Sequence, residues 1–140
     1  MNASIRLPTI KVGDKLPEHV QGPLKRGTLA LFAGASNDHV LLHIDSDFAK
    51  EAGMPDVFGH GMLSMAYLAQ MLTRWVPQDR LRHWNVRFTA ITPLYATIRC
   101  RGEVTEIFEE NGERRARLRI GAFIDGDKQT LDGEAVVAIN

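Results

Sequence analysis

Hydrophobic residues follow different patterns in the two halves of the chain, and no internal repeat joins them. In the first half they occur in short runs that suit helices. Residues 28–36 (TLALFAGAS) predict a short helix that ends near Gly34 and Asn37. Residues 61–75 (GMLSMAYLAQMLTRW) predict a longer helix that is apolar on nearly every side. We therefore expect the second helix to be buried in a core.

The second half alternates polar and apolar residues, which is the pattern of strands whose two faces meet different surroundings. Every second residue from Arg115 to Arg119 is an arginine, which predicts a strand with one solvated face. Asn111-Gly112 and Asp125-Gly126 supply residues that tolerate the positive φ of tight hairpin turns. The expected strands are 83–91, 96–108, 113–124 and 128–139.

One buried helix followed by a run of antiparallel strands predicts an α+β fold in which a curved sheet wraps around a single helix, the hot-dog architecture. The 140 residues match the size of one domain, so we expect a single domain over residues 1–140. With 44% hydrophobic and 24% charged residues, the composition is that of a globular protein and excludes disorder.

The net charge narrows the classes of binding partner, and the cysteine content and hydropathy indicate the cellular compartment. Seventeen basic and seventeen acidic side chains give a net charge of zero, so no long-range field attracts nucleic acid or an anionic membrane. The single cysteine, Cys100, forms no internal disulfide and no zinc-site pattern, which is typical of a reducing compartment. The most apolar window, 61–72, is shorter than the roughly 20 residues that a membrane span requires. We expect a cytoplasmic protein without a targeting or membrane segment.

The densest group of polar residues lies just before the longer helix. An Asp and a His five residues apart, Asp38 and His43, can hold and activate a water molecule, because histidine titrates near neutrality. The first amide of the helix, at Gly61, has no partner within the helix and is suited to binding a developing oxyanion. Turn and cap formation also explains such a cluster. Its members are Asn37, Asp38, His39, His43, Asp45 and Asp47, followed by His60-Gly61.

Other candidates have equally simple structural explanations. Arg74 and Arg87, together with Arg80 and Arg82, would suit the phosphates of coenzyme A or of a phosphopantetheine carrier, although exposed arginines need no ligand. Four methionines would suit either an acyl tunnel or core packing. They are Met54, Met62, Met65 and Met71.

Three segments of the first half resemble the MaoC-like or (R)-specific enoyl-CoA hydratases. They are residues 38–45 (DHVLLHID), 48–50 (FAK) and 60–63 (HGML). The family has an Asp-x-Asn-Pro-(Leu/Ile/Val)-His loop that is followed by a His-Gly-Met helix start. The similarity extends to residues 11–14, 85–88 and 133–135, and so to nearly the whole chain.

The resemblance implies a hot-dog dimer that reversibly adds water to a trans-2-enoyl thioester and gives an (R)-3-hydroxyacyl thioester. Carried over by position, the catalytic pair is Asp38 and His43, and the Gly61 amide holds the thioester carbonyl, with His60 and Met62 beside it in the substrate-binding helix start. No metal or other cofactor is expected, since coenzyme A or phosphopantetheine is part of the substrate. The expected assembly is a homodimer or larger oligomer, or a hetero-oligomer with a related subunit.

Two positions depart from the family pattern. Val40-Leu41 replaces the Asn-Pro pair, which removes side-chain hydrogen bonds and a fixed φ from the loop. Ala69 stands where some relatives carry a serine near the substrate. Two alternatives therefore stay open: a thioesterase of the same fold, and a subunit that binds acyl thioesters without turning them over.

Overall fold

The chain forms one antiparallel sheet with a helix lying along it, as seen in a computed structural model that describes residues 9–140. The sheet has five strands in the order β1-β3-β4-β5-β2. The strands are β1 (His19–Gln21), β2 (Leu81–Phe88), β3 (Ile98–Glu110), β4 (Glu113–Ile124) and β5 (Lys128–Ala138). This arrangement confirms the α+β prediction, and the bounds of β4 agree with it at both ends.

Two tight turns join β3, β4 and β5 into a meander. Asn111 and Gly112 have φ values of 52° and 71°, and Asp125 and Gly126 have values of 48° and 81°. Positive φ at both central residues gives a turn whose twist matches that of the flanking strands. The two turn predictions are therefore confirmed.

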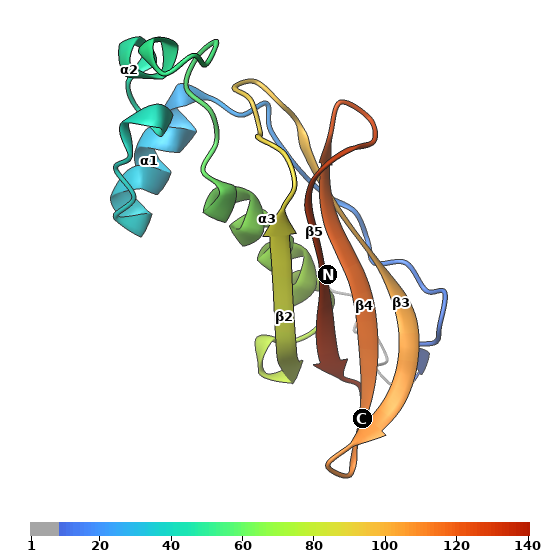
Figure 1. Ribbon diagram of the computed structural model, residues 1–140. Helices are drawn as coiled ribbons and strands as arrows, with labels where there is room; N and C mark the ends of the chain where they lie inside the picture. The colour runs from blue at the N-terminus through green and yellow to red at the C-terminus, as the bar shows by residue number, and fades with distance from the viewer. Residues whose placement is uncertain (1–8) are drawn as a thin grey trace.

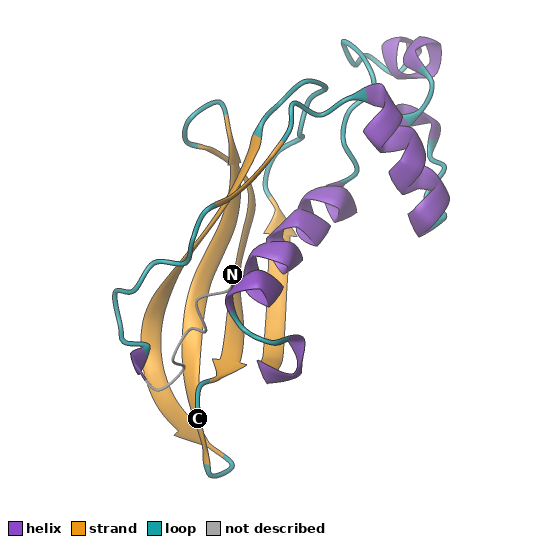
Figure 2. Cartoon of the chain, turned by 180° about the vertical axis from the view of Figure 1, so that it is seen from behind, coloured by secondary structure: helices purple, strands orange, loops and turns teal. Residues whose placement is uncertain are grey.

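Helix α3 (Gly61–Trp75) packs along one face of the sheet, as Figures 1 and 2 show from opposite sides. Leu68 and Leu72 are fully buried against inward-facing strand residues such as Leu118. Removal of this apolar surface from water provides the main stabilisation of the core. The helix is not buried on every side, contrary to the sequence-based expectation. The sheet covers only one face, and Met62, Gln70, Thr73 and Arg74 are exposed.

Two short helices, α1 (Arg26–Ser36) and α2 (Ser46–Glu51), lie beyond the end of the sheet near the start of α3 (Figure 1). We call residues 26–51 the overhang. The overhang has its own small core, in which Leu29 and Ala49 pack with Val57 and Leu63. Helix α2 begins at Ser46, because Asp45 Oδ1 accepts the amide protons of Asp47 and Phe48 at 2.9 and 3.2 Å.

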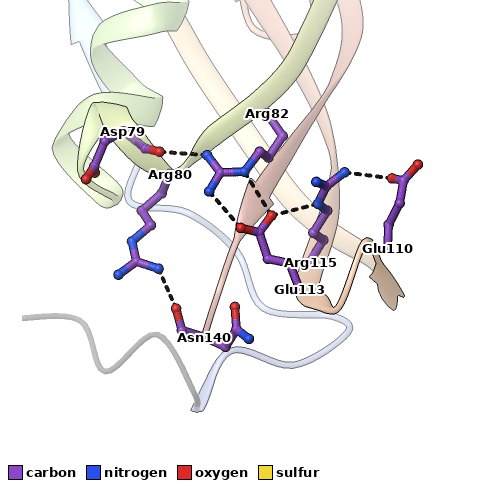
Figure 3. Close-up of polar contacts among 7 residues, drawn as sticks. All are labelled: Asp79, Arg80, Arg82, Glu110, Glu113, Arg115 and Asn140. Carbon is purple, nitrogen blue, oxygen red and sulfur yellow. Dashed lines mark hydrogen bonds and ion pairs between the residues drawn. The ribbon is translucent and has the colours of Figure 1, made fainter.

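The outward face of the sheet is covered with ion pairs, as the alternation of arginines in β4 predicts. Arg117 pairs with Glu106 on β3 and with Glu134 on β5. At the end of the sheet that is far from the overhang, Glu113 accepts hydrogen bonds from Arg82 and Arg115 (Figure 3). These ion pairs lie on the side of the sheet that α3 does not cover. They confirm the prediction that one face of β4 is exposed to solvent.

Strand β1 has no counterpart in the sequence prediction. It is three residues long and follows no alternating pattern, so it forms only because Val20 and its neighbours pair with β3. Its first residue, His19, is buried, and its ring nitrogens lie 2.8 Å from Gln70 Oε1 and 3.0 Å from an Arg74 nitrogen.

Candidate active site

A cavity of about 300 Å³ lies where the overhang meets the start of α3 and the end of β2. Asp38 and His43 line it from the overhang, Gly61, Met62 and Ser64 from α3, and Phe88 from β2. The fold therefore brings together both halves of the predicted chemistry, the Asp/His pair and the first residue of the long helix. They are more than fifteen residues apart in sequence.

The backbone of the next segment fixes the orientation of His43. Its Nδ1 lies 2.7 Å from the carbonyl oxygen of Phe58. Because a carbonyl oxygen can only accept, Nδ1 carries the proton and donates it. The other ring nitrogen, Nε2, is then unprotonated in the neutral ring and can accept a proton. His43 is half-buried and lines the cavity, so it is placed to act as a base.

Asp38 lies at the exit of α1, directly after the left-handed residue Asn37 (φ 58°). Within the described residues 9–140, its carboxylate makes one long hydrogen-bond contact, 3.4 Å from the amide of Val40. Most of the hydrogen-bonding capacity of this carboxylate is therefore free for a bound molecule. One donor atom from each of Asp38, His43 and His60 lies within 4.8 Å of the others.

These three donor atoms are a poor set for a metal ion, because the two imidazole rings are stacked. The ring centroids of His43 and His60 are 4.0 Å apart, and the ring planes differ by 27°. A histidine binds a metal through a lone pair in the plane of its ring. The lone pairs of two stacked rings do not converge on one ion, so the cluster fits proton transfer better than metal binding.

His60 itself does not line the cavity, contrary to its predicted place in the substrate-binding helix start. Its side chain is buried, and Nε2 lies 3.1 Å from the backbone carbonyl oxygen of Asp38. Burial is the main cause that lowers the pKa of His60 below its ordinary value of about 6.5, with a smaller contribution from His43. His60 is therefore a neutral residue behind the site.

Gly61 is the first residue of α3, where the backbone amides have no partner within the helix and carry partial positive charge. Its Cα faces the ring of Phe88, and the exposed side chain of Met62 lies on the same edge of the cavity. Both Gly61 and Met62 thus occupy the positions expected of a substrate-binding helix start.

A functional candidate that the sequence analysis missed is Ser64. It is buried, lines the cavity and has its Oγ 3.4 Å from Thr92 Oγ1. Its signal was a serine one turn into an otherwise apolar helix, on the same face as the first residue. The family resemblance pointed to position 69 instead. Ala69 lines a separate cavity on the other side of Met62.

This second cavity has a volume of about 370 Å³ and is mostly apolar. It also borders Asp38 and Met62. Its lining comes from Phe32 on α1, Met65 and Ala66 on α3 and Trp84 on β2. Two of the four methionines considered for an acyl tunnel therefore line a cavity. Met54 packs against the small core of the overhang, and Met71 lies in the main core.

The structure does not bring Arg74 or Arg87 to either cavity. Arg74 is in the last turn of α3, about 20 Å along the axis from Gly61, and contacts His19. Arg87 pairs with Asp132 at 3.4 Å on the open face of the sheet, since its neighbour Val86 faces the core. Neither arginine lines the two cavities, and their role in phosphate binding stays a prediction.

A charged clamp holds the overhang against the segment before α3. Arg26 donates to both oxygens of Asp56, at 2.9 and 2.6 Å, and to Ser46 Oγ at 2.9 Å. Hydrogen bonds from Arg26 and Ser46 lower the pKa of Asp56 below its usual range. The clamp therefore joins the start of α1, the start of α2 and the entry to α3, and so lies on both sides of loop 38–45.

Comparison with known proteins identifies the family. The model of the MaoC like domain matches residues 9–120, which is most of the chain. The chain belongs to the MaoC-like domain family. A search of curated proteins finds no match for its sequence.

Solved structures extend the comparison over the whole MaoC-like domain. The unliganded R-hydratase PhaJ1 from Pseudomonas aeruginosa superposes with a TM-score of 0.84 and 28% identity, covering 96% of this chain and 85% of that one. The (R)-hydratase from A. caviae involved in PHA biosynthesis gives 0.83 and 25%, covering 94% and 98%. The ChsH1-ChsH2 complex from Mycobacterium tuberculosis gives 0.80 at 19% identity, covering 94% and 99%, which shows the shared fold only.

These comparisons confirm the family resemblance and the hot-dog fold that the sequence predicts. They also support an activity of the hydratase or dehydratase type. Among residues 9–140, no helix is long and apolar enough to cross a membrane.

Proposed function

We propose that this MaoC-like protein reversibly adds water to the double bond of a trans-2-enoyl thioester and forms an (R)-3-hydroxyacyl thioester. The observation that carries the proposal is the joint position of Asp38, His43 and the Gly61 amide on one cavity. The (R) configuration rests on the similarity to the two (R)-hydratases. Coenzyme A or phosphopantetheine enters only as part of the substrate, and the reaction as written needs no metal ion or redox cofactor.

In this reaction Asp38 and His43 act on one water molecule. The carboxylate of Asp38 accepts one hydrogen bond from the water, and His43 Nε2 accepts the other. As the water oxygen attacks C3, the pair takes up one proton, and the same pair delivers one proton to C2. The product gains the elements of one water, and the enzyme returns to its starting protonation state.

The amide at Gly61 stabilises the charge that this attack creates. Attack at C3 moves electrons through the conjugated system onto the thioester oxygen. A helix N-terminus with an unpaired N–H is suited to hold that enolate oxygen. Ser64, one turn further along α3 in the same cavity, offers a hydroxyl to the substrate.

The two cavities offer room for the two ends of the substrate. Asp38 and Met62 border both, so a molecule bound at the Asp/His pair can extend to either side of them. We propose that the acyl chain enters the apolar cavity beside Met65 and Trp84. The thioester then lies at Gly61, and the pantetheine arm leaves past the exposed ring of Phe88.

We further propose that two copies pair along the edge strand β2 in a homodimer. Among residues 9–140, β2 ends the sheet and pairs with β5 on one side only. An unpaired edge is a template for a second strand. Phe88 and Met62, both exposed, lie at the cavity on this edge. A monomeric mass in solution at micromolar concentration would count against this assembly.

The protein is expected in the cytoplasm.

A turnover assay on a panel of trans-2-enoyl thioesters tests the proposed activity. The panel varies the acyl chain from short to long and the carrier between coenzyme A and acyl carrier protein. Loss of enoyl absorbance together with chiral analysis of the 3-hydroxyacyl product would support the proposal. Release of free thiol instead would identify a thioesterase.

A non-catalytic subunit is the second candidate, and one observation favours it. Val40 and Leu41 in the catalytic loop are 51% and 46% exposed, so their side chains do little to hold the loop. Binding of an enoyl thioester without turnover, by the protein alone and with a related subunit, would replace the hydratase proposal with this one.

A further inference from the structure

We propose that His60 is a positioning residue that joins the catalytic loop to the oxyanion-binding amide, through a hydrogen bond from its Nε2 to the backbone of Asp38. This inference rests on the proposed function, because it concerns how the same site is held in its active arrangement. Its closing experiment includes a measurement that does not depend on turnover.

The hydrogen bond fixes the protonation of the ring. His60 Nε2 lies 3.1 Å from the carbonyl oxygen of Asp38, which can only accept, so Nε2 carries the proton. Nδ1 then has no proton in the neutral ring. Among the buried side-chain nitrogens and oxygens of residues 9–140, His60 Nδ1 is the one without a hydrogen-bond partner. A positive charge at this position would be poorly solvated, so the ring is kept neutral.

The ring of His60 also supports the ring of His43. The two are stacked at 4.0 Å, and the edge of Phe32 from α1 contacts His60 at 4.9 Å between centroids. The His60 side chain thus contacts both members of the Asp/His pair, Asp38 through the backbone and His43 through its ring face. It reaches neither cavity, since only 1% of its surface is exposed.

Its place in the chain gives this contact a consequence for catalysis. Three hydrogen bonds join the loop 38–43 to the segment 58–60: His60 Nε2 to Asp38 O, His43 Nδ1 to Phe58 O and Phe58 N to Leu42 O, at 3.1, 2.7 and 3.4 Å. The next residue is Gly61. The same short segment therefore sets the position of the Asp/His pair and of the amide that faces the substrate oxygen. Of these three bonds, the one from His60 is the bond that holds the backbone of Asp38, since the other two are made by His43 and Leu42.

The loop has few other anchors at this end. The side chains of Val40 and Leu41 are about half exposed, and the amide of Val40 makes only a 3.4 Å contact with the Asp38 carboxylate. The amide of Asp38 also lies 3.3 Å from Ser36 Oγ, but this contact holds Asp38 to the end of α1 and not to the segment before Gly61. Loss of the bond from His60 would therefore loosen the position of Asp38 relative to Gly61. A misplacement of about 1 Å between catalytic groups can lower turnover by about a hundredfold.

Three substitutions separate the hydrogen bond from the ring contact. H60Q keeps a donor at the position of Nε2 and removes the ring. H60F keeps a stacked ring and removes the donor, and H60A removes both. H39Q is the matched control, because His39 is exposed in the same loop and stands outside the site.

For each variant kcat and KM on an enoyl thioester are measured together with the free energy of unfolding in urea. H60F and H60A are expected to lose about tenfold or more in kcat, with KM changed by less than about threefold. H60Q should stay within about threefold of wild type and above H60F, and H39Q should match wild type. The inference would be overturned if H60F kept full turnover, or if kcat in all three His60 variants simply followed their stability.

Nuclear magnetic resonance of protein labelled with ¹⁵N-histidine tests the hydrogen bond without any substrate. Spectra that connect ring nitrogens to ring protons should show His60 protonated at Nε2 and unprotonated at Nδ1 at neutral pH, with the Nε2 proton slow to exchange. A proton on Nδ1 instead would refute the bond even in an active enzyme. Lack of turnover by wild type with the expected tautomer would refute the proposed function and leave the bond established.

Discussion

The ring of Phe88 lies against the backbone of Gly61, so closely that a Cβ built on this glycine would be 3.0 Å from Phe88 Cε1 and 3.2 Å from Cδ1 and Cζ. Phe88 is 58% exposed, which leaves its ring free to turn away. Any side chain at position 61 would therefore displace the ring into the cavity or stand there itself. The backbone conformation of Gly61 does not require a glycine, because its φ is not positive. What the glycine leaves open is the space between the helix start and the ring of Phe88.

The first prediction follows from this contact. Gly61→Val should lower kcat by about a hundredfold, because the β-branched side chain stands between the helix amide and the thioester oxygen. The free energy of unfolding should change by no more than about 1 kcal/mol, since the displaced ring is at the surface. Steady-state kinetics and urea unfolding measure the two quantities.

Gly34→Val is the matched control, since Gly34 is also helical and a Cβ there would meet no atom within 4 Å. Its turnover and stability should stay close to those of wild type. Full activity in Gly61→Val would show that Gly61 only begins the helix.

The second prediction concerns acid stability and the ion pairs of Figure 3. Hydrogen bonds from Arg82, and next from Arg115, lower the pKa of Glu113 from 4.5 to about 2. A carboxyl whose pKa is lower in the folded state stabilises the fold above its unfolded pKa and loses this effect as the pH falls towards its folded pKa. Glu113→Gln should therefore be less stable than wild type near neutral pH, and the difference should disappear between about pH 4.5 and pH 2.

Urea unfolding at a series of pH values, at low and high salt, measures this difference. Salt should reduce it, because the pairs are near the surface. Glu109→Gln is the control, since Glu109 is an exposed residue on the neighbouring strand. Turnover should be unaffected in both variants, because this end of the sheet is far from the overhang. A constant difference at all pH values would mean that Glu113 acts through packing.

The third prediction tests the clamp between the overhang and the entry to α3. Asp56→Asn removes the charge that Arg26 binds through two nitrogens, and it weakens the bond to Ser46. We expect lower thermal stability and a drop in kcat of about threefold to tenfold, because the loop that carries Asp38 loses support at both ends. Asp47→Asn in α2 is the control and should change neither quantity much. Lower stability with unchanged kcat would make the clamp purely structural.

The order of strands β3, β4 and β5 could be predicted, because short residue pairs in the sequence determine the tight turns between them. Asn111-Gly112 and Asp125-Gly126 fix the meander, and alternation in β4 fixes which face is solvated. β1 was not predictable, because three residues carry no period and their strand pairing is with β3 alone among residues 9–140. The all-round burial expected for α3 was wrong, since a helix rich in apolar residues does not reveal which of its sides a sheet will cover.

In the site, residue type and spacing together with the family resemblance pointed to Asp38, His43 and the helix start at Gly61, and the fold brings all three to one cavity. Their catalytic roles stay a prediction. The roles of His60 and Ser64 were not predictable, because both depend on which way a side chain points after folding. His60 turns away from the cavity towards the Asp38 carbonyl, and Ser64 points into it. Arg74 and Arg87 looked clustered in sequence, but the helix axis and the strand face separate them.

The fourth prediction concerns the Asp/His pair itself. His43→Ala removes the nitrogen that accepts a proton from water, and Asp38→Asn keeps the shape of the side chain while removing its charge. Each should cost about a hundredfold or more in kcat, with little change in stability, because both residues are partly exposed at the cavity. The measurement is steady-state hydration of the best enoyl thioester in the panel.

The double variant distinguishes one shared water from two independent contributions. If both residues act on the same water, either loss disables it, and the double variant should be scarcely slower than each single variant. Independent roles would instead multiply the two losses. His39→Ala serves as the control and should keep most activity, because His39 is exposed and outside the cavity. An essential His39 with a dispensable His43 would shift the catalytic loop by four residues and contradict the hydrogen bond from His43 to Phe58 as the feature that orients the base.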